Sequence, residues 1–138
     1  MNHLPPEESK ILTEKLKSVG IEVETEYGYA SYELTQKITD PHRPIRKADY
    51  PKMSKVPTYT LSEMLELLPR INFKGESYYP HLSPRSTDWY VHWIWRQDDE
   101  TYRQLETRKP KDNFESDTPL IAIYHALLWA IDEGYIHN

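Results

Sequence analysis

"STDWYVHWIWR", residues 86–96, places three tryptophans, a tyrosine and a histidine in a single short segment. Tryptophan or valine occupies every second position from Trp89 to Trp95, a period of two that is typical of a half-buried β-strand. One side of this strand would carry Trp89, Val91, Trp93 and Trp95, and the other side Tyr90, His92, Ile94 and Arg96. Burying one tryptophan removes on the order of 150 to 250 Å² from water, so we expect the tryptophan side to face the core.

An apolar helix near the C-terminus offers the surface on which these tryptophans can pack. In SDTPLIAIYHALLWAIDEG, Thr118 suits the N-cap, Pro119 the first helical position and Gly134 the C-terminal end. The sequence therefore predicts a single α+β domain over residues 1–138, with an antiparallel sheet packed against the helix 118–133. The helix is apolar around most of its circumference, which predicts burial on a second side. The N-terminal part of the chain or a second copy covers that side, and we favour a homodimer.

Prolines divide the chain into three parts. Residues 1–38 predict a helix followed by two strands joined near Gly28. Residues 39–58 hold four prolines and five Lys or Arg against two Asp, so we expect a basic connector there. Residues 59–138 predict a short helix capped by Thr60, a three-stranded sheet and the long helix. The three strands are expected at residues 71–82, with breaks at Gly75 and Pro80, at 88–96 and at 101–108.

Composition limits the classes of function. The chain has 138 residues and a net charge of -5 with both signs scattered along it, so general attraction to nucleic acid or anionic membrane is not expected. It has no cysteine, which excludes disulfides, thiol catalysis and thiolate metal sites. No stretch approaches the roughly 20 apolar residues of a membrane span, and the N-terminus lacks the apolar run of a signal peptide. We expect a cytoplasmic protein without membrane contact.

Signatures of catalysis are missing from the sequence. Neither G-x-S-x-G, nor a phosphate-binding loop, nor G-x-G-x-x-G, nor H-E-x-x-H occurs. The sequence therefore does not predict an enzyme, and it indicates no cofactor.

A binding surface is the main functional hypothesis that the residues support. Aromatic and histidine side chains on the second side of the strand, with Tyr78, Tyr79 and His81 from the preceding strand, would form a platform for stacking. The basic connector would supply contacts to an anion. The predicted ligand-binding residues are Tyr79, His81, Tyr90, His92 and Arg96 on the strands, and Arg43, Arg46 and Lys47 on the connector.

Two other interpretations of the same residues stay open. The second side of the strand can be an ordinary solvated sheet face, since tyrosine and histidine are common on exposed strands. A metal site is the weaker alternative, with His81 and His92 across a hairpin and Asp88 or Glu76 completing the set.

The order of elements from Thr60 to Asp132 resembles the topology of a double-stranded RNA-binding domain. That family places lysines at the start of its last helix, where this chain has the acidic segment ESDTPLI, so phosphate would be repelled.

A second resemblance covers more of the chain. The segments VPTYTLSEMLELLP and SDTPLIAIYHALLWAIDEGYI are similar to small uncharacterised proteins of phages and mobile elements of gut bacteria. This resemblance implies action on a host macromolecule or signalling molecule and assigns no site residue. We therefore expect a non-catalytic binding protein that engages a host macromolecule, most readily a protein. The alternative is a binder of a nucleotide-like ligand.

Overall fold

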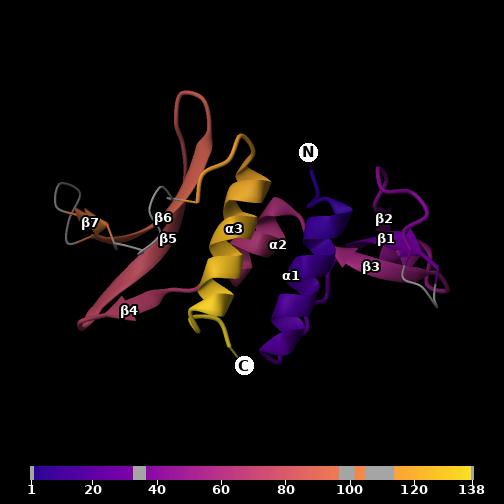
Figure 1. Cartoon of the computed structure of the whole chain (residues 1–138), viewed down its shortest axis with the longest axis horizontal. Coiled ribbons are helices and arrows are strands. Elements are labelled where there is room, and N and C mark those ends of the chain that lie inside the picture. The colour runs from indigo at the N-terminus through magenta and orange to yellow at the C-terminus, as the bar shows by residue number, and fades with distance from the viewer. Residues whose placement is uncertain (1, 33–36, 97–101, 105–113, 138) are drawn as a thin grey trace.

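In the described part of the chain, three α-helices form a layer between two antiparallel sheets of the computed structural model (Figure 1). The structure describes residues 2–32, 37–96, 102–104 and 114–137. The helices are α1 (Pro6–Ser18), α2 (Leu61–Leu67) and α3 (Pro119–Asp132). The first sheet has the order β2-β1-β3, with β1 Tyr27–Ser31, β2 Ile45–Arg46 and β3 Ser54–Thr58. The second has the order β4-β5-β6-β7, with β4 Ile71–Phe73, β5 Glu76–Pro84, β6 Trp89–Arg96 and β7 Tyr102–Gln104. The predicted α+β class is confirmed.

The predicted packing of the tryptophan side of β6 on α3 is also confirmed. Val91 and Trp93 are fully buried, and the Trp93 ring lies 5.3 Å from that of Trp129 on α3. The α3 helix begins where expected, because the Thr118 hydroxyl accepts a hydrogen bond from the Ile121 N–H at 3.3 Å. Within the described residues, no helix combines the length and the apolar character needed to cross a membrane.

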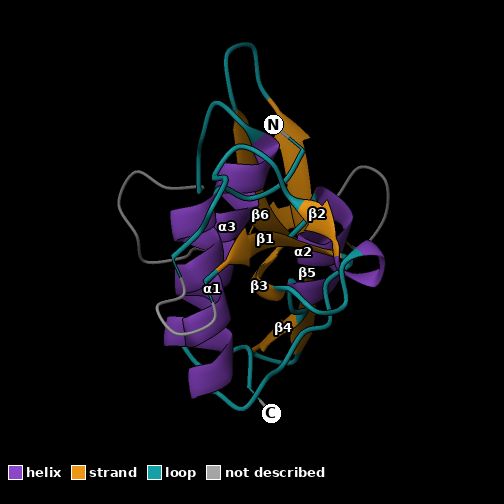
Figure 2. Ribbon diagram, turned by 90° about the vertical axis from the view of Figure 1, so that its right-hand side faces the viewer, coloured by secondary structure: helices purple, strands orange, loops and turns teal. Residues whose placement is uncertain are grey.

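The second side of α3 is covered by α1 and α2 of the same chain. Figure 1 shows α1 and α3 side by side, and in the turned view of Figure 2 α1 lies in front of α3. Lys15 of α1 forms a 2.7 Å ion pair with Asp132 of α3. Leu12 and Leu16 of α1 are buried in the same cluster of apolar side chains as α3. Intrachain packing thus accounts for the apolar circumference that suggested a homodimer, and the homodimer stays an untested prediction.

The N-terminal sheet differs from its prediction. Gly28 lies inside β1 rather than in a turn, and segment 21–25 belongs to no strand. The partners of β1 are β2 and β3, which come from the region expected to be a loop connector. A Cβ atom on Gly28 would lie 3.0 Å from both the Lys55 Cβ and the Val56 carbonyl oxygen, so this glycine permits close strand contact. Pro57 is accommodated because β3 is an edge strand.

The second sheet has four strands rather than three. The segment 71–82 divides at Lys74 and Gly75, whose positive φ values of 51° and 79° form a tight hairpin turn. Pro80 does not break β5, since β4 begins at Ile71 opposite Tyr78 and does not pair with the part of β5 that contains Pro80. The last strand, β7, occupies part of the predicted segment 101–108, of which residues 101 and 105–108 lie outside the described residues.

The α2 helix confirms the predicted capping box. The Thr60 hydroxyl accepts from the Glu63 N–H at 3.2 Å, and a Glu63 carboxylate oxygen accepts from the Thr60 N–H at 2.8 Å. The capping box therefore pairs two of the N–H groups that would otherwise be unpaired at the start of the helix.

Candidate functional site

The face of the second sheet opposite the tryptophans, called the outer face below, carries most of the predicted strand residues. Pairing of β5 with β6 sets these outer-face residues opposite one another: Tyr79 with Ile94, His81 with His92, and Ser83 with Tyr90. The structure therefore brings Tyr79, His81, Tyr90 and His92 together on one surface.

Two further residues assigned to this surface fall differently. Tyr78 lies on the opposite side of β5 and is buried in the core, because successive side chains of a strand alternate. Including Tyr78 in the platform was wrong. The backbone of Arg96 occupies an outer-face position of β6, and its side chain lies outside the described residues.

Histidine and tyrosine rings form a contiguous group on the outer face. The centre of the His92 ring lies 4.6 Å from the centre of the Tyr90 ring and 6.0 Å from that of the His81 ring. The His92 Nε2 atom lies 3.2 Å from the Ser83 hydroxyl, and only 8% of His92 is exposed. Tyr79, in contrast, is 50% exposed. Tyr79 and His81 thus offer contact area, while His92 mainly supports its neighbours.

Arginine side chains lie over both ends of this group. The guanidinium of Arg70 lies 5.8 Å from the centre of the Tyr79 ring, and that of Arg85 lies 4.9 Å from the centre of the Tyr90 ring. Arg85 also pairs with Asp88 at 2.6 Å and with Glu115 at 3.0 Å. The hydrogen bonds that Arg85 donates to Asp88 hold the pKa of that carboxyl below its usual value. The charge of Arg85 is therefore already balanced.

The metal alternative finds little support in this geometry. Asp88 is held by Arg85, and Glu76 occupies the same side of β5 as Tyr78, away from the two histidines. Across the described ranges, no three His, Asp or Glu side chains gather in a way that could hold a metal ion.

The predicted basic residues lie on the other side of the molecule. Arg43 precedes β2, Arg46 ends it, and Lys47 begins the 3₁₀ turn Lys47–Asp49. In Figure 1 the helical layer separates this first sheet from the sheet that carries Tyr90. The two halves of the predicted nucleotide site therefore do not converge on one concavity.

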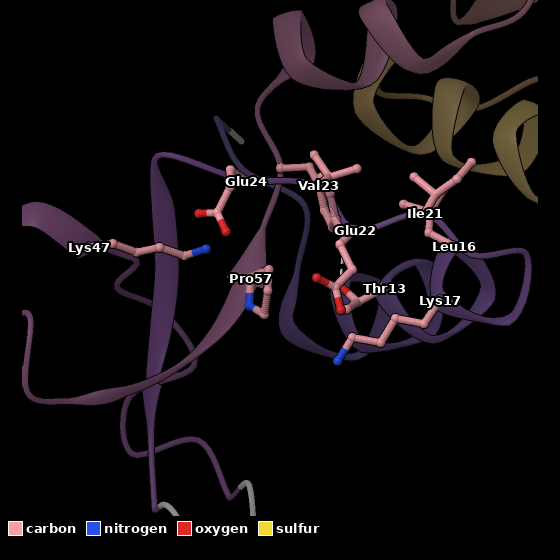
Figure 3. A pocket seen from close by; sticks show the side chains of 10 residues that line it. Thr13, Leu16, Lys17, Ile21, Glu22, Val23, Glu24, Lys47 and Pro57 are labelled. Atoms are coloured by element: carbon pink, nitrogen blue, oxygen red, sulfur yellow. Dashed lines mark hydrogen bonds between the residues drawn. The ribbon is translucent and has the colours of Figure 1, made fainter. Parts of the chain in front are cut away.

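Sequence reasoning missed a cavity of about 200 Å³ beside α1 (Figure 3). The cavity is lined by α1, by segment 21–24 and by Lys47. Pro57 of β3 and Tyr59 complete the lining. The local sequence signal for this cavity is the alternation of apolar and acidic residues in segment 21–24. Such alternation predicts that one side of the segment is charged. The presence of Lys47 there follows only from the strand pairing.

Another cavity, of about 410 Å³, lies at the N-terminal end of α1. It is lined by Asn2, His3, Pro5, Pro6, Tyr29, Pro41, His42 and Pro44. The Nε2 atom of His3 is buried without a hydrogen-bond partner among the described residues, and the ring packs edgewise on Tyr27 at 4.6 Å. Burial lowers the pKa of His3, against the opposing effect of Glu63 and Glu26.

The lowered pKa of His3 predicts that the protein loses stability in mild acid. The unfolded chain takes up a proton near the ordinary histidine pKa of about 6.5, whereas folded His3 does so only at lower pH. The free energy of unfolding should therefore fall as the pH drops below about 6.5. Replacing His3 with phenylalanine should remove part of this slope in urea unfolding measured at several pH values. The control is His42→Phe, at the exposed histidine of the same cavity. Equal slopes for His3→Phe and the parent would contradict the assignment.

Comparison with known proteins identifies no relative: no family model, no curated protein and no solved structure matches the chain.

Proposed function

We propose that this chain is a non-catalytic binding protein of phage or mobile-element origin, which engages a host protein in the cytoplasm through the outer face. The observation that carries the proposal is the open aromatic surface formed by Tyr79, His81 and Tyr90, with an arginine over each tyrosine. Tyrosine and arginine are the residue types enriched at the energetic centres of protein interfaces.

Electrostatics favour a protein over a nucleotide-like ligand. Arg85 is already paired with two carboxylates, so the Tyr90 end of the face offers little net positive charge to a phosphate. Arg43, Arg46 and Lys47 lie beyond the helices. The whole chain carries a net charge of -5, which opposes a polyanion at long range. The nucleotide alternative therefore loses the three basic residues that were predicted to bind its phosphate.

The test is capture from a host lysate followed by reconstitution with the purified partner. Tyr79→Ala and Tyr90→Ala should each weaken that binding by about tenfold or more, because truncating an interface hot spot costs roughly 2 kcal/mol. The matched control is Tyr50→Ala, since Tyr50 is 48% exposed and belongs to the first-sheet side.

Two outcomes would overturn the proposal. One is equal binding of the partner by the Tyr79, Tyr90 and Tyr50 variants. The other is a nucleotide that raises the melting temperature of the parent and not of the Tyr90 variant, since only a ligand bound by the native state stabilises it by mass action.

A further inference from the structure

Four charged side chains surround the cavity beside α1, and they come from three separate parts of the chain. Lys17 belongs to α1, Glu22 and Glu24 to the extended segment after it, and Lys47 to the turn after β2. Figure 3 shows the Lys47 amine and the two carboxylates directed toward the space beside Pro57.

These charges face one another without neutralising one another directly. Among the described residues, no ion pair within 4.0 Å includes any of the four. Burial lowers the pKa of Lys47, while Glu24 and Glu63 act in the opposite direction. The Lys47 amine has thus lost part of its hydration and has gained no direct partner, and both facts favour a ligand that supplies an anionic group.

Backbone hydrogen bonds anchor two of the segments that form the walls of the cavity. The Ile21 N–H donates to the Leu16 carbonyl at 2.9 Å, which fixes the start of the extended segment to α1. The Lys47 N–H donates to the Glu26 carbonyl at 3.0 Å, and the Lys55 amine donates to the Lys47 carbonyl at 3.1 Å. Such anchoring lowers the entropy lost on binding.

The rest of the lining is partly apolar. Leu16, Ile21, Val23 and Pro57 supply hydrocarbon surface. The hydroxyls of Thr13 and Tyr59 are hydrogen-bonded to each other at 2.7 Å. A neighbouring cavity of about 310 Å³ shares Thr13, Lys17 and Pro57, and it extends the concave surface along α1. Together the two cavities reach the size range of small-ligand sites, roughly 300 to 1,000 Å³.

We propose that this cavity binds a small zwitterion of the amino-acid class, a free amino acid or a dipeptide. The ligand carboxylate lies toward Lys47, and the ligand ammonium lies toward the neighbouring carboxylate of Glu24. A phosphate group would meet two carboxylates here, and a metal cation would meet two amines, so only a ligand with both charges matches the lining. This site lies apart from the outer face, so it stands or falls independently of the proposed host-protein binding.

The experiment is a melting-temperature panel with the standard amino acids and glycyl dipeptides, followed by calorimetry on any compound that stabilises the protein. We expect at least one zwitterion to raise the melting temperature. Its C-terminal amide and its N-acetyl derivative should each bind about tenfold more weakly, because each loses one charged contact.

Matched variants show whether the ligand occupies this cavity. Lys47→Met should weaken zwitterion binding by about tenfold and should no longer distinguish the free carboxylate from the amide. Glu24→Gln should in the same way lose the preference for a free ammonium group. The controls are Lys52→Met and Glu66→Gln, at exposed residues outside the lining. The melting temperature of each variant without ligand shows whether it is folded.

Three results would overturn the inference. The first is a panel in which no zwitterion stabilises the folded parent. The second is a bound zwitterion whose affinity changes equally in the Lys47 and Lys52 variants. The third is stronger stabilisation by inorganic phosphate or by a nucleotide, lost in Lys47→Met, which would make the site an anion site.

Discussion

Trp93→Ala is expected to lower the free energy of unfolding by about 3 to 5 kcal/mol, as removal of a large buried aromatic side chain does. Trp93 is fully buried, and the centre of its ring lies 5.3 Å from that of Trp129 and 5.9 Å from that of Phe114. Its indole N–H donates to the Pro69 carbonyl at 2.8 Å. The substitution therefore leaves a cavity where β6 meets α3, and it removes the hydrogen bond to the Pro69 carbonyl in the segment between α2 and β4.

Urea unfolding of matched variants measures this loss. Trp93→Phe keeps a ring in the core and loses the hydrogen bond, so it should fall between the parent and Trp93→Ala. Tyr79→Ala, at an exposed position on the outer face of the same sheet, should change stability by only about 0.5 kcal/mol. If Trp93→Ala unfolded like the parent while Tyr79→Ala was strongly destabilised, the two faces of β6 would be assigned the wrong way round.

Leu12→Ala is expected to cost about 2 to 5 kcal/mol, which tests whether α1 covers α3 within one chain. Leu12 is fully buried in the cluster that also contains Leu120, Ile123 and Leu127 of α3. Because this contact lies within the chain, the loss should be the same at all protein concentrations. The measurement is urea unfolding over a wide concentration range, together with sedimentation equilibrium of the parent.

The neighbouring residue provides the control. Ile11→Ala changes an exposed position on the same helix and should cost far less than Leu12→Ala. Stability that rises with protein concentration, together with a dimer in sedimentation, would instead support the homodimer, because association stabilises the folded state by mass action.

Helix ends and strand faces of this protein could be predicted because their signals are local. Thr60 with Glu63, and Thr118 with Pro119, mark the starts of α2 and α3 through hydrogen bonds and steric preferences that span a few residues. The alternation around Trp93 assigns each side chain of β6 to one of two faces, since the strand repeat is two residues. These parts of the fold were confirmed.

The candidate site could be predicted only in part. Tyr79 and His81 were placed on the same surface as Tyr90 and His92, and the register of β5 with β6 sets them side by side. Tyr78 was predicted on the wrong side of the sheet. Tyr78 and Tyr79 are adjacent in β5, so their side chains must point to opposite faces. Arg43, Arg46 and Lys47 were predicted to lie beside this surface and do not. The sequence of a connector does not show which side of the molecule the connector follows.

Local patterns along the chain thus established α2, α3, the tryptophan face of β6 and the apolar circumference of α3, because caps and periodicity depend on neighbouring residues. Long-range contacts established that β1 pairs with β2 and β3, that α1 and α2 cover α3, and that Lys47 faces Glu24 across a cavity. The pairing of strands and the packing of helices depend on which distant surfaces bury the most apolar area together and leave the fewest backbone groups unpaired, and the lining of the cavity follows from them. Which surfaces pair in this way depends on the whole chain, so the sequence of a single segment cannot predict it.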